Sequence, residues 1–205
     1  MMEAMPELAD AFLTQTVFAR VRTLAWEDLL KMPQPSEKLP ATTAVWRYGR
    51  ALAMLAKGDR AGAAKERAAF QQIAARIPPD APWGQNKAVD VMKLAREVLA
   101  ARFGEEPLTH WQKAVEIQDA FTYDEPPAWY YPVRESLGAE LLRAGRAPEA
   151  EKVLREGLRR SPRNGFMLFG LIEALKSQGK EVDQVKRELD AIWAKSDIKL
   201  TLAAL

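Results

Sequence analysis

Cysteine is absent from this sequence of 205 residues, and histidine occurs only once, as His110. The absence of cysteine excludes a disulfide framework, a thiolate metal ligand and a cysteine nucleophile. A single histidine cannot build a multi-histidine metal site, and no glycine-rich phosphate loop of the GxGxxG or GxxxxGK type occurs. We interpret His110, in the stretch PLTHWQKA, as a polar residue near a helix start. We therefore expect no catalytic residue, no metal site and no cofactor.

A surplus of one charge sign is also missing, because 30 lysine and arginine residues face 28 aspartate and glutamate residues. The basic side chains are scattered among acidic ones, so the chain lacks the electrostatic footprint that a phosphate backbone requires. Even the run Arg159, Arg160 and Arg163 is interpreted as a solvated helix end. Nucleic acid is not expected as a partner.

Long uncharged apolar runs are missing as well. No window approaches the roughly 18 apolar residues of a membrane span. The first 20 residues do not place an apolar run behind a basic region, so we expect no signal peptide and no membrane partner. The location stays open, with the cytoplasm favoured.

What the sequence does contain is helical periodicity. Apolar residues recur at spacings of three and four throughout, and alanine, leucine, glutamate, lysine and arginine fill the other positions. Glycine and proline punctuate these segments, and no convincing strand occurs. The pattern predicts an all-α chain of about nine helices. Pro132 and Pro148 are expected to open helices, and Gly145 and Gly179 to form left-handed turns between paired helices.

A repeat of about 34 residues accounts for the best-defined segment. Large and small residues alternate along it in a fixed order that ends in proline. The residues in this register are Leu137, Gly138, Leu141, Ala150, Leu154, Gly157 and Pro162. The small members allow helix backbones to approach closely, while the large members fill the adjoining space.

This register resembles the tetratricopeptide repeat. Over residues 12–205 the chain also resembles the C-terminal region of a group of bacterial proteins with such repeats and no assigned biochemical role, most specifically in YDEPPAWYYPVR. The resemblance implies one domain, a right-handed α-solenoid of antiparallel helix hairpins, and a chain shorter at its N-terminus than other members. We divide it into an N-terminal helical segment (1–40), repeat 1 (41–80), a degenerate repeat 2 with an insertion (86–127), repeat 3 (129–162), and repeat 4 with a C-terminal cap (163–205).

In the tetratricopeptide family, the first helix of each hairpin lines a concave groove that receives a peptide or a partner helix. The positions that correspond to this groove are Tyr48, Leu52, Leu94, Val98, Glu135, Ala139, Leu142, Arg143, Phe166, Phe169 and Glu173. Chaperone-binding members use asparagines where this chain has Glu135 and Ala139, so we do not expect it to bind a chaperone tail. The resemblance implies a non-catalytic scaffold with a protein or peptide partner.

Three other interpretations stay open. Asp124 and Glu125 could serve an all-helical hydrolase or a carbohydrate-binding protein that uses residues 123–131. Of the consecutive aromatic residues 129–131, at least one is expected to reach a groove or solvent, unless they seal the junction between two hairpins. The chain could also self-associate through its N-terminal end, because an apolar helix face there lacks its usual cover. That face comprises Phe12, Val17, Val21 and Leu24.

Overall fold

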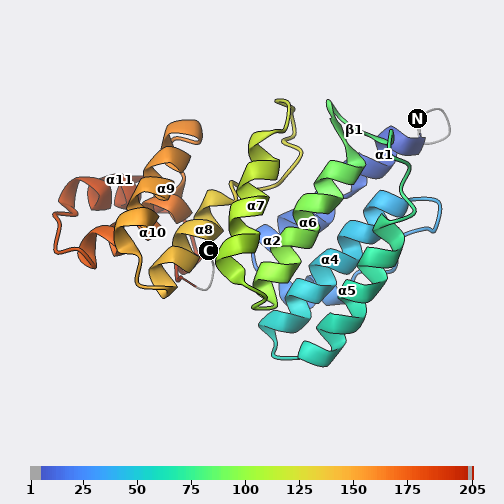
Figure 1. Ribbon diagram of the computed structural model, residues 1–205, viewed down its shortest axis with the longest axis horizontal. Helices are drawn as coiled ribbons and strands as arrows, with labels where there is room; N and C mark the ends of the chain where they lie inside the picture. Colours follow the sequence, from blue (N-terminus) through green and yellow to red (C-terminus); the bar gives the residue numbers. More distant parts are fainter. Residues whose placement is uncertain (1–5, 203–204) are drawn as a thin grey trace. The chain divides into compact units, whose positions relative to one another are not determined.

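The computed structural model describes residues 6–202 and 205, and most of these residues are helical (Figure 1). The first helices are α1 (Pro6–Leu13), α2 (Gln15–Arg22), α3 (Trp26–Lys31), α4 (Pro40–Ala56) and α5 (Arg60–Ala74). They are followed by α6 (Ala88–Arg102), α7 (Pro107–Asp119), α8 (Arg134–Arg143), α9 (Ala147–Arg160), α10 (Gly165–Lys176) and α11 (Asp183–Trp193). The prediction of an all-helical chain is confirmed. The helices outnumber the expected nine partly because the N-terminal segment folds as three short ones.

Two short strands, β1 (Pro82–Trp83) and β2 (Asn86–Lys87), form an antiparallel hairpin that the sequence pattern did not indicate. Each strand has two residues, so no alternation could signal it. The chain divides into two compact units, Met1–Tyr131 and Pro132–Leu205, called here unit 1 and unit 2. The boundary between them falls inside the segment assigned to repeat 3.

Helix α4 is the centre of unit 1, where it packs against α5, α6 and the three N-terminal helices. Its own N-cap residue offers no side-chain hydrogen bond. Instead, the buried carboxylate of Asp10 accepts hydrogen bonds from the backbone N–H groups of Ala41, at 2.8 Å, and Thr42, at 2.7 Å. A negative charge at this position also matches the positive end of the helix dipole. Helix α1 therefore supplies the cap of α4.

Helix α2 also lies close to α4, at Gly49. A β-carbon at Gly49 would lie 2.8 Å from Cγ1 of Val17, so only glycine allows this approach. Val17 and Val21 are 0% and 6% exposed, and Leu24 is half-buried. The expectation of an uncovered apolar face is therefore corrected at these positions, because α4 covers α2. Phe12 stays 54% exposed.

The aromatic residues 129–131 join the core of unit 1. Tyr130 stacks on Phe18 with ring centroids 4.6 Å apart, and Trp129 meets Tyr48 edge to face at 5.5 Å. The hydroxyl groups of Tyr48 and Tyr130 are 2.9 Å apart, and burial raises the pKa of both phenols. Trp129 and Tyr131 are buried and Tyr130 is half-buried. None of the three is an exposed anchor, since they cover helices α2 and α4.

Unit 2 contains the repeat register, and its helices pack in consecutive pairs, α8 with α9, α9 with α10, and α10 with α11. Gly145 has φ +72°, and the next N–H group, that of Arg146, donates to the carbonyl of Leu141 at 2.8 Å. The left-handed turns predicted at Gly145 and Gly179, whose φ is +65°, are confirmed. Pro148 lies in the first turn of α9, and α8 begins two residues after Pro132.

The small residues of the register lie at close helix contacts. A β-carbon at Gly138 of α8 would lie 2.6 Å from Cδ2 of Leu154 on α9, which is fully buried. A β-carbon at Gly157 would likewise meet the sulfur atom of Met167 on α10. The predicted roles of Gly138 and Gly157 as close-approach positions are therefore confirmed within unit 2.

Glu151 of α9 fixes the turn between α10 and α11. Its carboxylate accepts hydrogen bonds from Lys180 Nζ at 2.7 Å, Arg155 Nε at 2.9 Å and Gln178 Nε2 at 3.0 Å. These contacts, with that of Lys180 the strongest, lower the pKa of Glu151 from its ordinary value of 4.5 to about 2. The charged form of Glu151 therefore stabilises the folded state.

We expect Glu151→Gln to lower the free energy of unfolding at pH 7. Since the folded-state pKa is depressed, the contribution of Glu151 is complete above about pH 4.5 and disappears as the pH falls toward 2. The difference between the two proteins should therefore shrink over that interval. Urea unfolding at several pH values measures it, with Glu116→Gln, an exposed site on α7, as the control. A difference independent of pH would contradict this assignment.

Candidate functional site

The expected groove positions of unit 1 are not accessible. Tyr48 and Leu94 are 0% exposed, Val98 1% and Leu52 8%. Tyr48 lies under Trp129, and its helix is packed on several sides by α5, α6 and the N-terminal helices. These four residues are therefore part of the core of unit 1 and do not line an open groove.

In unit 2 the expected groove positions have different surroundings, and some of them stabilise the helices instead of lining a groove. Glu135 is fully buried and accepts a hydrogen bond from Nδ2 of Asn164 at 2.8 Å. The Oδ1 atom of Asn164 in turn accepts from the N–H of Met167 at 3.0 Å and so caps α10. Glu135 thus positions a helix cap. Glu173 is half-buried and pairs with Lys176 at 2.9 Å, while Leu142 is half-buried.

The four remaining positions form one surface together with Ser136, which was not among the expected groove residues, and we call this surface the α8/α10 face. It is defined by Ser136, Ala139 and Arg143 of α8 together with Phe166 and Phe169 of α10. Ala139 and Phe166 belong to one apolar cluster, and Phe169 packs against it. Arg143 is exposed at the edge of the face, where its guanidinium pairs with Glu140 at 2.8 Å.

A segment of the chain itself lies on the α8/α10 face. After α11, Leu205 joins the buried apolar cluster, and Ile198, Leu200 and Leu202 pack against it. Arg143 Nη2 donates to the carbonyl of Leu202 at 2.5 Å, and Ser136 Oγ donates to the carbonyl of Leu205. The face thus offers apolar contacts and two hydrogen-bond donors to an extended backbone.

The opposite side of α10 borders a cleft of about 730 Å³ that sequence reasoning missed. Its lining combines apolar side chains with polar ones that carry charges of both signs. The apolar residues are Leu158, Leu168, Leu171, Leu175 and Val185, and the polar residues are Arg155, Arg159, Glu181, Asp183, Gln184, Arg187 and Glu188. Because side chains at i, i+3 and i+7 share one side of a helix, Leu168, Leu171 and Leu175 lie away from Phe166 and Phe169. The signal was present in GFMLFGLIEAL, which is apolar on both sides.

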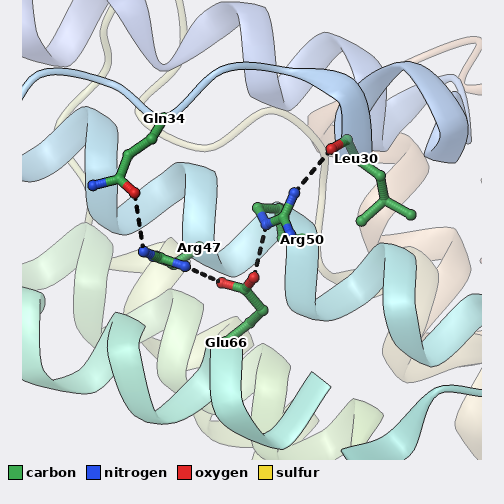
Figure 2. Close-up of polar contacts among 5 residues, drawn as sticks. All are labelled: Leu30, Gln34, Arg47, Arg50 and Glu66. Atoms are coloured by element: carbon green, nitrogen blue, oxygen red, sulfur yellow. Dashed lines mark hydrogen bonds and ion pairs between the residues drawn. The ribbon is translucent and has the colours of Figure 1, made fainter. Parts of the chain in front are cut away.

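Unit 1 contains a polar cluster around the buried side chain of Glu66 on α5, shown in Figure 2. Its carboxylate accepts from Arg47 Nη1 at 2.9 Å and Arg50 Nε at 2.7 Å, both on α4. Arg50 also donates to the carbonyl of Leu30 at 2.9 Å, and Arg47 lies 3.4 Å from Gln34. Since every one of these contacts joins elements of unit 1, we assign the cluster a structural role.

The carboxylates considered for catalysis belong to a surface loop. Asp124 accepts a hydrogen bond from the N–H of Gln85 at 2.8 Å, and so holds the loop to the β1–β2 turn. Asn86 strengthens this link, because its side chain donates to and accepts from the backbone of Thr122, at 3.0 and 2.8 Å. Glu125 is exposed and bonded to the hydroxyl of Tyr123, which is 79% exposed. Asp124 thus has a local structural task.

His110 lies in the first turn of α7, as expected, with Nδ1 2.6 Å from a carboxylate oxygen of Glu97 on α6. Within residues 6–202 and 205, no group of three or more histidine, aspartate or glutamate side chains is arranged to hold a metal ion. Among the helices of that same range, none combines the length and apolarity needed to cross a membrane.

Comparison with protein-family models, with curated proteins and with solved structures finds no match for this chain. The functional conclusion therefore depends on the surfaces described above. Of these, the α8/α10 face is the one on which another segment of the chain lies, and it contains four of the positions that the sequence pattern placed in a groove, Ala139, Arg143, Phe166 and Phe169.

Proposed function

We propose that this chain is a non-catalytic protein-protein interaction module of the tetratricopeptide type. Its helix pairs form a right-handed solenoid, and its α8/α10 face binds an extended segment of a partner protein. Two observations support this proposal. The register of small residues lies at close helix contacts, at Gly138 and Gly157. The face between α8 and α10, the first helices of repeats 3 and 4, already accommodates the side chains of Ile198, Leu200, Leu202 and Leu205.

The second observation carries the proposal. Peptide recognition by a rigid surface combines donors or acceptors for the peptide backbone with apolar sites for some of its side chains. Arg143 and Ser136 supply the donors, and Ala139, Phe166 and Phe169 supply the apolar sites. Charge plays a small part, because Arg143 is compensated by Glu140. The matching partner is an apolar extended segment.

Selection of a displayed peptide library against the full chain tests this function. We expect the selected peptides to lose about tenfold in affinity to Arg143→Ala, since a hydrogen bond to a charged group contributes about 1.5–3 kcal/mol. Arg159→Ala is the matched control, because this exposed arginine borders the cleft on the other side of α10. Calorimetric titration of both variants gives the affinities.

Two results would contradict the proposal. The first is a library that yields no peptide with saturable binding to the chain. The second is a peptide whose affinity falls with Arg159→Ala and is unchanged with Arg143→Ala, because that peptide would bind in the cleft.

A further inference from the structure

Residues 198–202 have the exposure pattern of a bound strand. Ile198, Leu200 and Leu202 are half-buried, and the residues between them, Lys199 and Thr201, are exposed. In an extended backbone, successive side chains point to opposite sides. The alternation therefore places the apolar side chains on the protein and the polar ones in solvent. Residues 198–202 therefore contact the α8/α10 face as a separate peptide would.

The contacts of this segment can be formed by other chains. Arg143 binds the carbonyl oxygen of Leu202, an atom that every peptide has, and Ser136 donates to a main-chain oxygen of Leu205, so neither hydrogen bond selects a side chain. The apolar cluster around Phe166 selects instead for apolar residues at every second position. Any extended segment with this spacing can form the same contacts.

The segment is also only partly buried against the α8/α10 face. Three of its apolar side chains, Ile198, Leu200 and Leu202, remain half-exposed. Beyond α11, the backbone from residue 196 to 201 has no helical or strand structure. Trp193 at the end of α11 holds the start of the segment, through a hydrogen bond from Nε1 to the carbonyl of Ile198 at 2.9 Å. This bond tethers the segment beside the face.

We propose that residues 198–202, together with Leu205, are an intramolecular ligand of the α8/α10 face, which competes with a partner segment that has apolar residues at alternate positions. This inference rests on the proposed function and adds the pattern of the partner and its regulation. A tether keeps the segment at an effective concentration on the order of millimolar, so a partner must displace it in order to bind. The apparent affinity for the partner falls in proportion to the fraction of molecules with a free face.

The experiment uses the full chain and a fluorescent peptide with the sequence of residues 195–205, KSDIKLTLAAL. One variant carries Ile198→Asp and Leu200→Asp, which remove apolar contacts of the segment. Its control carries Lys199→Asp, an exposed position in the same segment that gives the same change in net charge. Fluorescence anisotropy measures peptide binding, and circular dichroism checks that each protein keeps its helices.

We expect the double variant to bind the peptide at least tenfold more tightly than the unaltered chain, and Lys199→Asp to bind it like the unaltered chain. Equal affinity in all three proteins would overturn the competition and leave the proposed function intact. Absence of binding in all three, together with an empty library selection, would remove the proposed function as well. A dimer of the unaltered chain that the double variant converts to a monomer would mean that a second copy supplies the segment, which also overturns the inference.

A second measurement needs no variant and covers the case in which the double variant does not fold. Hydrogen exchange of the unaltered chain is followed while a peptide from the library selection is added. We expect exchange to accelerate at least tenfold in residues 196–202 and to stay slow in α10. Unchanged exchange in residues 196–202 at saturating peptide would overturn the inference.

Discussion

Glu66→Gln is expected to lower the free energy of unfolding of unit 1 by about 3 kcal/mol, the lower end of the range for breaking a buried ion pair. Glu66 is 7% exposed, and it is the acceptor for Arg47 and Arg50. Glutamine keeps one oxygen acceptor but removes the charge, so two partly buried guanidinium groups lose their counter-ion. The contact between α4 and α3 should weaken as well. Arg50, which loses its ion pair with Glu66, also donates a hydrogen bond to the carbonyl of Leu30 on α3.

Urea unfolding monitored by circular dichroism measures this effect. Glu116→Gln on α7 is the control, because this side chain is exposed and its replacement should change stability by no more than about 0.5 kcal/mol. A loss below about 1 kcal/mol for Glu66→Gln would mean that the ion pairs contribute no more than exposed ones do.

The second large effect is expected for Leu154→Ala, which should lower the stability of unit 2 by about 3–5 kcal/mol. Leu154 is 0% exposed and fills the space between two glycines, Gly138 of α8 and Gly170 of α10. Its removal leaves a cavity bounded by helix backbones, which cannot collapse as far as side chains can.

Gly138→Ala provides a sharper form of the same test. In the unaltered chain the new methyl group would lie 2.6 Å from Cδ2 of Leu154, which costs about 1–3 kcal/mol of overpacking. In the Leu154→Ala background the same methyl group enters the vacated space, and alanine also favours the helix over glycine. The double variant should therefore be more stable than Leu154→Ala alone.

A double-mutant cycle of these four proteins gives the coupling free energy. Because the chain contains two compact units, hydrogen exchange of α8, α9 and α10 should accompany the urea titrations, so that the change in unit 2 is measured directly. Additive losses would contradict direct packing of Leu154 against Gly138.

Helices and their turns could be predicted from the sequence because their determinants are local. Gly145 and Gly179 mark left-handed turns that few other residues adopt, and Pro148 fits only the first turn of a helix. The spacing of Gly138 and Gly157 also identified close contacts correctly, because the size of a side chain limits how near two helices can lie.

Accessibility could not be predicted in the same way. Periodicity places Tyr48 and Ala139 on a helix face, but it does not say which distant segment covers that face. Trp129 covers Tyr48 from 81 positions further along the chain, and Leu205 joins the cluster of Ala139. The Glu66 cluster was missed for a related reason. Its ion pairs depend on how α4 and α5 lie against each other, and the sequence of either helix alone does not indicate this.

The cap of α4 has a consequence for synthesis on the ribosome. Asp10 precedes Ala41 by 31 residues, so the acceptor is translated well before the two amides that it binds. At about 5–20 residues per second, Asp10 is synthesised roughly 2–6 seconds before Ala41. The cap of α4 therefore forms only after Ala41 and Thr42 have been added and the polypeptide has folded back onto α1.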